Sequence, residues 1–239
     1  ISSRLGLDHD RVVSGHYALA VLARHLHLRD FALADVHHAN KLLYWYIHSV
    51  LWGRYTGSTE TILASDAALL DGSLDDLDRL IEALQRSRGT LTVHPDDLRG
   101  WSLGNRFYPL LYLLARVGHA VDWCTGVNVS HWLLGRSNQL QVHHIFPKAL
   151  LAQAGYRKEE INAIANYAFL TASCNNSLRD RDPAEYLPEI EHKFPGALES
   201  QWIPMDRSLW RIERYREFLA VRRQLLADAA NRFLDGLLT

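Results

Sequence analysis

Apolar residues recur every three or four positions through most of the first 135 residues of this 239-residue chain, as in "GHYALAVLARHLHL" and "LADVHHANKLLYWYIHSVLWGRY". That spacing places them on one face of a helix, and such a face must pack against other helices. Ser58 and Thr59 begin one such segment with helix-capping residues, while Ser73 and Gly89 bound the next. The sequence therefore predicts a helical bundle over residues 1–135.

The pattern changes after Gly135. "QLQVHHIF" alternates like a strand, "YAFLTA" is a short apolar strand, and "SCNNSLRD" opens with residues that favour a helix start. Between the strands, "KALLAQAG" and "RKEEINAIAN" have short helical patterns. We expect the order strand, excursion, strand, helix.

These patterns predict a mainly α fold, with a helical bundle and a small strand–strand–helix motif embedded in it. The expected division is a helical bundle domain at 1–135, a strand–strand–helix core at 136–195 and a C-terminal part at 196–239. In the last part, the segment from "PMDRSLW" to the end is predicted as one long helix that packs on the core.

Two adjacent histidines, His143 and His144, lie in the first predicted strand. Neighbouring residues on a strand point to opposite faces, so packing alone does not require both imidazoles. A metal held between the first strand and the helix would use one histidine, and the other would face the substrate as a base. The plainer alternative is a surface strand. For His37 and His38 in "DVHHANK", a solvated helix face is the expected setting.

The segments around this pair resemble a known family. "HHIFP", followed by Asn166 and Asn175 in "IANYAFLTASCNNSL", resembles the HNH (ββα-metal) nucleases. More closely, these segments, "DRDPAEYL" and the terminal "EFLAVRRQLLADAANRFL" are similar to the C-terminal nuclease part of GmrSD-type and Ssp-type restriction proteins of bacterial defence.

The resemblance implies a role for each of these residues. His143 corresponds to the first metal ligand, His144 to the general base, Asn166 to the residue that fixes the loop between the strands, and Asn175 to the helix ligand. Many members have histidine where Asn175 stands, and an amide oxygen favours a hard ion such as Mg²⁺ or Mn²⁺ over tightly held Zn²⁺. The third ligand stays open between water, substrate phosphate and three side chains: Asn176, Arg179 and Asp180.

The implied function is a metal-dependent DNA endonuclease, which nicks or cuts double-stranded DNA by phosphodiester hydrolysis in an anti-phage restriction protein. A neutral imidazole can take a proton from water, and a divalent ion can stabilise the phosphate charge. Net charge is −1, so any DNA contact must be local; Lys148, Arg179 and Arg181 are the expected phosphate contacts. The alternative is a catalytically inactive nucleic-acid-binding or scaffolding module with a structural metal site.

From the composition we expect a reducing, non-membrane setting. Cys124 and Cys174 are the two cysteines, without a CxxC pair, which argues against a disulfide framework and favours the cytoplasm. No stretch has the roughly 18 apolar residues of a membrane span. The chain starts at Ile1 rather than Met, so we expect an upstream region of a longer protein to be missing. The resemblance implies that this region hydrolyses nucleotide and senses modified DNA, in agreement with the lack of a GxxxxGK[ST] motif in these residues.

Overall fold

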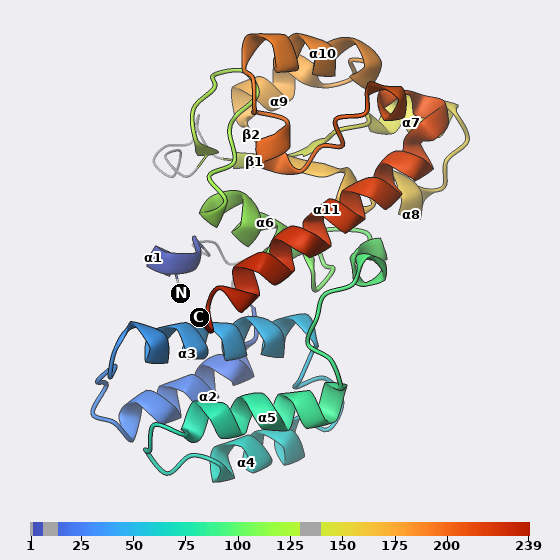
Figure 1. Cartoon of the computed structure of the whole chain (residues 1–239). Coiled ribbons are helices and arrows are strands. Elements are labelled where there is room, and N and C mark those ends of the chain that lie inside the picture. The colour runs from blue at the N-terminus through green and yellow to red at the C-terminus, as the bar shows by residue number, and fades with distance from the viewer. Residues whose placement is uncertain (1, 7–13, 130–139) are drawn as a thin grey trace. The chain divides into compact units, whose positions relative to one another are not determined.

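The computed structural model describes residues 2–6, 14–129 and 140–239 (Figure 1). The described chain is mainly helical, as the sequence predicts, with one two-stranded sheet. It divides into two compact units: Ile1–Asp8 with His94–Ala229, and His9–Val93 with Ala230–Thr239. Among the described residues, no helix is both long enough and apolar enough to cross a membrane.

The second unit is built from four helices that follow one another along the chain: α2 (His16–His27), α3 (Val36–Leu51), α4 (Thr59–Ala68) and α5 (Asp76–Arg88). Their inward faces carry leucines such as Leu22, Leu43 and Leu80, all nearly inaccessible. The predicted caps hold in part, since α4 follows Ser58 and α5 ends at Gly89, but α5 begins at Asp76 rather than Ser73.

A buried polar chain in this unit corrects the expectation for His38. Its side chain is buried rather than solvated, and its Nε2 lies 2.8 Å from Nε2 of His25. His25 Nδ1 in turn lies 3.0 Å from Asp76 Oδ2. Asp76 is at the start of α5, so this chain of three buried side chains joins α2, α3 and α5. The sequence spacing of His38 gave no sign of these distant partners.

The first unit contains the sheet, the remaining described helices and several 3₁₀ turns. The elements are α1 (Ser2–Leu5), a 3₁₀ turn (Pro95–Arg99), α6 (Tyr108–Val117), β1 (Leu140–His144), α7 (Lys148–Gln153), α8 (Lys158–Ile161), a 3₁₀ turn (Ile164–Asn166), β2 (Tyr167–Thr171), α9 (Ala172–Leu178), α10 (Pro183–Lys193), 3₁₀ turns (Glu199–Gln201, Arg207–Trp210, Ile212–Arg214) and α11 (Tyr215–Asp235), whose residues from Ala230 on belong to the second unit.

The two units divide the chain differently from the predicted boundaries at residues 135 and 195. Residues 94–129 belong with the sheet rather than with the preceding helices. The reason is aromatic packing, since Tyr108 and Tyr112 of α6 lie 6.0 and 5.2 Å (ring centroids) from Phe169 of β2. Buried aromatic contacts of this kind add to the area they remove from water.

The last helix is shorter than predicted. Arg211 has an extended backbone (φ −89°, ψ 145°), which separates two 3₁₀ turns and delays α11 until Tyr215. The Trp210 indole donates to the carbonyl of Pro204 at 2.7 Å and stabilises this irregular segment. From Tyr215 on, α11 packs on the core of the first unit: Phe146 lies 4.9 Å from Tyr215 and 4.8 Å from Phe218 between ring centroids.

Strands β1 and β2 pair antiparallel over five residues, from Leu140 opposite Thr171 to His144 opposite Tyr167. A pair of such short strands is marginal by itself. Side chains bond the outer edge of β2: Gln201 Oε1 accepts from Phe169 N at 2.9 Å, and Gln201 Nε2 donates to Phe169 O at 2.9 Å. Asp122 Oδ2 accepts from Thr171 N at 2.8 Å. The outer edge of β2 is thus closed by side chains from elsewhere in the unit.

A buried arginine supports the same region. Arg222 of α11 is nearly inaccessible and donates to the carbonyls of Ala165 at 2.7 Å and Gln201 at 3.0 Å. Desolvation lowers its pKa to about 9, so the guanidinium still carries its charge at neutral pH. Arg222 therefore fixes the backbone of Ala165, which precedes Asn166, and the backbone of Gln201, whose side chain bonds Phe169.

We predict that Gln201→Ala lowers the free energy of unfolding by about 2–3 kcal/mol, because buried backbone groups of Phe169 lose their partners. Urea unfolding checks this. Gln224→Ala, at an exposed position of α11, is the control and should change stability by less than about 0.5 kcal/mol. Equal effects of the two substitutions would contradict the role given to Gln201.

Candidate functional site

The two histidines of β1 lie in different environments. β2 runs directly into α9, so the strand pair and the helix form one continuous unit. His143 is buried, in the space between the strand and the helices, while His144 on the opposite face of the strand is half-buried. The alternation of a strand therefore sends the two imidazoles to separate sites, as the sequence suggests.

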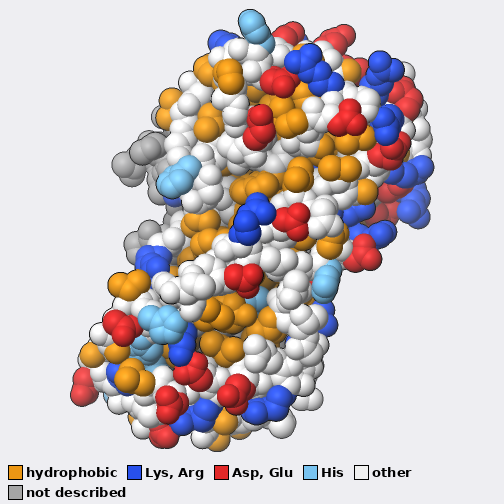
Figure 2. Space-filling view, viewed as in Figure 1, with side chains coloured by type: hydrophobic (Ala, Val, Ile, Leu, Met, Phe, Trp, Pro, Cys, Tyr) orange, Lys and Arg blue, Asp and Glu red, His pale blue; other side chains and the backbone are white. Residues whose placement is uncertain are grey.

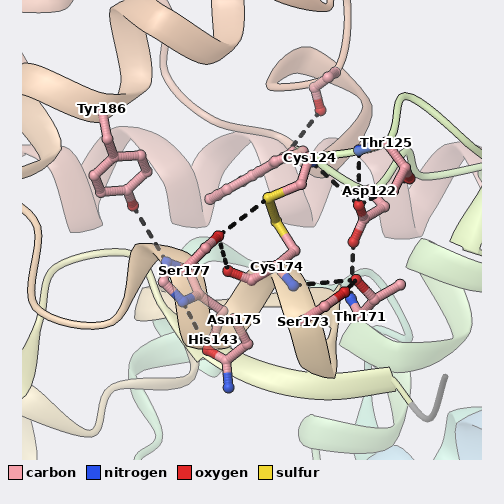
Figure 3. Close-up of a disulfide and its surroundings, with 12 residues drawn as sticks. Asp122, Cys124, Thr125, His143, Thr171, Ser173, Cys174, Asn175, Ser177 and Tyr186 are labelled. Atoms are coloured by element: carbon pink, nitrogen blue, oxygen red, sulfur yellow. Dashed lines mark hydrogen bonds between the residues drawn. A yellow bond between two sulfur atoms is a disulfide. The ribbon is translucent and has the colours of Figure 1, made fainter. Parts of the chain in front are cut away.

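His143 faces α9 and α10 (Figure 3). Its Nδ1 lies 2.9 Å from Oδ1 of Asn175, and its Nε2 lies 3.4 Å from the hydroxyl of Tyr186. Tyr186 donates its proton to the carbonyl of Ile145 at 2.7 Å, so the same hydroxyl oxygen can accept from His143 Nε2–H. Trp123 packs edge-on against the imidazole at 5.7 Å. Burial lowers the pKa of His143 to about 4, so the ring is neutral at pH 7.

Asn175 is held in place by the start of α9. The hydroxyl of Thr171 accepts from Cys174 N at 3.3 Å and caps the helix. The Asn175 amide nitrogen donates to Gln141 Oε1 at 2.9 Å, which turns the amide oxygen toward His143. One nitrogen and one oxygen, both uncharged, thus meet from the strand and the helix.

His144 lies beside the excursion between the strands. Its Nε2 is 3.3 Å from Asn162 Oδ1, and its ring contacts Tyr167 edge-on at 4.9 Å. Burial, followed by the positive charge of Lys148, lowers the pKa of His144 to about 4, below the value near 6.5 expected for a free imidazole. With its Nε2 proton directed at Asn162, Nδ1 is the atom left to accept a proton.

Asn166 is fully buried and joins the two ends of the excursion. Its Oδ1 accepts from Phe146 N at 2.9 Å, and its Nδ2 donates to the carbonyls of Phe146 at 3.0 Å and Ile161 at 3.1 Å. Its own carbonyl accepts from Ile145 N at 2.9 Å. These bonds hold the backbone that directly follows His144.

A disulfide joins Cys124 to Cys174, with 5.5 Å between the Cα atoms (Figure 3). The prediction that this chain contains no disulfide is therefore wrong, and the argument from cysteine count to a reducing compartment falls with it. Cys174 is buried, as a small helix-start residue would be. The bond ties the loop after α6 to the first turn of α9, one residue before Asn175.

The chemistry of the donors fits a weakly held hard cation. Within the described part of the chain, the one group of three acidic, cysteine or histidine side chains whose ligand atoms all lie within 4.8 Å of one another is Asp122, Cys124 and Cys174, and its sulfurs are bonded to each other. His143 Nδ1 and Asn175 Oδ1 are both neutral and face each other. Two neutral donors suit Mg²⁺ or Mn²⁺ that completes its shell with water and phosphate. Tyr186 on the other ring nitrogen would fix the tautomer that leaves Nδ1 for the metal.

The remaining predicted residues lie at the surface. Asn176, Arg179 and Asp180 are exposed, and among the described residues none is hydrogen-bonded to His143 or to the Asn175 side chain. Lys148 is exposed at the first position of α7, and Arg181 pairs with Glu189 at 2.7 Å. On the face shown in Figure 2, basic and acidic side chains are interspersed rather than separated.

Sequence reasoning missed Tyr186, Asn162, Gln141 and Trp123. Tyr186 lies inside "DRDPAEYL", one of the segments that carry the resemblance, but the resemblance implies no role for the tyrosine. Gln141 occupies the strand position two residues before His143, so the period of the strand places it on the same face. Asn162 and Trp123 have no such signal, because their positions depend on the tertiary fold.

Comparison with known proteins gives little guidance on function. No family model matches the sequence. The chain is similar to an uncharacterized protein of Methanocaldococcus jannaschii, with 24% identity over 164 residues. The matched region covers 68% of this chain but 27% of the archaeal protein. The similarity therefore concerns part of a much longer protein.

Burial of His143 predicts a pH-dependent stability. Its pKa of about 4 in the folded state lies below that of an exposed histidine, so the unfolded chain binds the proton first as pH falls. The contribution of the neutral His143 ring to the free energy of unfolding is complete above about pH 6.5 and is lost as pH falls toward 4. In chelator, His143→Gln should reduce the loss of unfolding free energy between pH 7 and pH 5 by about 2 kcal/mol.

Urea unfolding at the two pH values measures this difference. His192→Gln, at an exposed position of α10, is the matched control and should keep the parent pH dependence. A His143→Gln protein whose stability falls with pH as steeply as that of the parent would contradict the assignment.

Proposed function

We propose that this chain is a metal-dependent DNA endonuclease module of the HNH (ββα-metal) type. The observation that supports it most directly is the pairing of His143 Nδ1 from the first strand with Asn175 Oδ1 from the helix, at 2.9 Å. Those are the two positions that the family resemblance gives to metal ligands. Asn166 supports the same proposal, since it bonds the backbone at both ends of the excursion between the strands.

In this proposal His143 and Asn175 hold Mg²⁺ or Mn²⁺. When bound, the ion supplies positive charge for the phosphate and the leaving oxygen. His144 is the general base, and its low pKa keeps the imidazole unprotonated at neutral pH. Asn162 positions that ring through Nε2, which leaves Nδ1 to accept the proton of the attacking water.

Three basic side chains would contact the phosphates of double-stranded DNA. Lys148 is close enough to His144 to lower the pKa of that histidine, which places its charge beside the proposed base. A phosphate beside Lys148 would offset this charge and raise the pKa of His144. Arg179 and Arg181 follow the end of α9, where Arg181 would exchange Glu189 for a phosphate.

We further propose that the module is the effector part of a longer anti-phage restriction protein. The supporting facts are the resemblance to restriction proteins and the archaeal relative, of which this chain matches 27%. Nucleotide hydrolysis and recognition of modified DNA would then reside in an upstream domain. The catalytically inactive, scaffolding alternative predicts no cleavage of DNA, and a cleavage assay therefore distinguishes the two.

We predict that His144→Ala lowers metal-dependent cleavage of supercoiled plasmid at least about 100-fold, the usual contribution of a general base. The assay compares Mg²⁺, Mn²⁺ and chelator at several salt concentrations, with far-ultraviolet circular dichroism as the folding check. His192→Ala, which removes an exposed histidine of the same unit, should keep the parent rate. A folded His144→Ala protein that cleaves at the parent rate refutes the assignment, and a parent protein inert with both metals favours the scaffolding alternative.

A further inference from the structure

A polar pocket in the second unit lies far along the sequence from β1, β2 and α9. It has a volume of about 360 Å³, within the range of small-molecule sites. Its walls come from α3, from the end of α5 and the segment after it, and from the last turn of α11 with Asp235. The polar lining residues are Tyr44, His48, Gln85, Thr90, Thr92, Asn231 and Asp235.

His48 of α3 lines this pocket, and its hydrogen bond determines which ring nitrogen carries the proton. Trp52 donates its indole proton to His48 Nδ1 at 3.1 Å. Burial lowers the pKa of His48 to about 4, so the ring is neutral and its proton must lie on Nε2. Nε2 is buried and has no hydrogen-bond partner within the residues that the structure describes. A buried donor of this kind is costly unless something accepts its proton.

Other side chains around the pocket also lack hydrogen-bond partners among the described residues. Within the described part of the chain, the hydroxyl of Tyr44, the amide of Gln85 and the carboxylate of Asp235 form no hydrogen bond, although all three line the same space. Asn231 differs, because its amide bonds both the N–H and the carbonyl of Val93 at 2.9 Å and so fixes one wall. The pocket thus offers donors and acceptors together on a braced frame.

The charge of the lining selects the ligand. Asp235 is the single acidic side chain among the lining residues, and neither lysine nor arginine contributes. Phosphate or carboxylate groups would meet a negative charge without a cation to offset it. Hydroxyl groups suit the lining, since each can donate to the carboxylate of Asp235 and also exchange hydrogen bonds with the amide of Gln85. The rings of Tyr44 and His48 contact each other in the wall, with centroids 4.3 Å apart and planes tilted by 59°.

We infer that this pocket binds a neutral, polyhydroxylated molecule of monosaccharide size, with Gln85 and Asp235 as its polar partners and His48 in the wall behind it. The inference is independent of the proposed nuclease activity. The pocket and the histidine pair of β1 share no residue, so either assignment can fail without the other.

The test uses the full chain and three neutral probes, D-glucose, D-galactose and D-ribose, with D-glucose 6-phosphate as the charged counterpart. The Trp52 indole signal in a ¹H–¹⁵N spectrum, assigned with Trp52→Phe, reports on the bond to His48. At least one neutral sugar should shift it saturably with a Kd of about 1 mM, a usual affinity for so small a ligand. The phosphate ester should bind at least about tenfold more weakly.

Variants locate the site by ligand-observed saturation-transfer measurements. His48→Phe, Gln85→Ala and Asp235→Ala should each weaken binding about tenfold or more, while His16→Phe, at an exposed position of the same unit, should not. The last two pocket residues are exposed, so their variants stay informative even if His48→Phe does not fold. No saturable shift with any neutral sugar, or equal binding of the phosphate ester, overturns the inference.

Discussion

Two side-chain amides substitute for strands that the small sheet lacks. β1 and β2 pair over only five residues, yet they must hold His143 and His144 in fixed positions. Gln201 bonds the open edge of β2 at Phe169, and Asn166 bonds the backbone of Phe146 immediately after β1. Arg222 reaches the carbonyls of Ala165 and Gln201 and so links the two. Because each bond is buried, its loss leaves a backbone group without water to replace the partner.

This frame explains how one short strand serves two environments. His143 is enclosed by Trp123 and Tyr186 and meets Asn175, whereas His144 lies on the other face beside Asn162 and Lys148. Burial lowers the pKa of both rings, so both are neutral near pH 7. A neutral imidazole can be a metal ligand or a base, and the proposed function uses one histidine for each role. The disulfide from Cys174 to Cys124 anchors the helix that carries Asn175.

Local sequence patterns predicted the local structure well. The alternation around His143 appears as β1, and the helical spacing before residue 129 appears as helices. The helix predicted for "SCNNSLRD" appears as α9, although its cap is Thr171, two residues earlier than that segment. What the patterns missed depends on partners far along the chain. Cys124 and Cys174 are 50 residues apart. His38 was expected to be solvated, but it is buried against His25 of another helix. Gln201 bonds Phe169, which lies 32 residues away in the sequence. Periodicity reports which face a residue occupies and carries no information about such pairings.

The same distinction applies to the candidate site. The resemblance selected His143 and Asn175, and the fold brings them within 2.9 Å. The surrounding residues Tyr186 and Gln141, which fix the orientation of the two donors, became visible only in the folded chain. The central claim is that these donors hold a divalent ion. Crystals soaked in Mn²⁺ and measured at the manganese absorption edge test it directly. We expect an anomalous peak within bonding distance of His143 Nδ1 and Asn175 Oδ1 that is absent in His143→Ala. A saturated soak without a peak at this pair would show that the two side chains do not hold the ion.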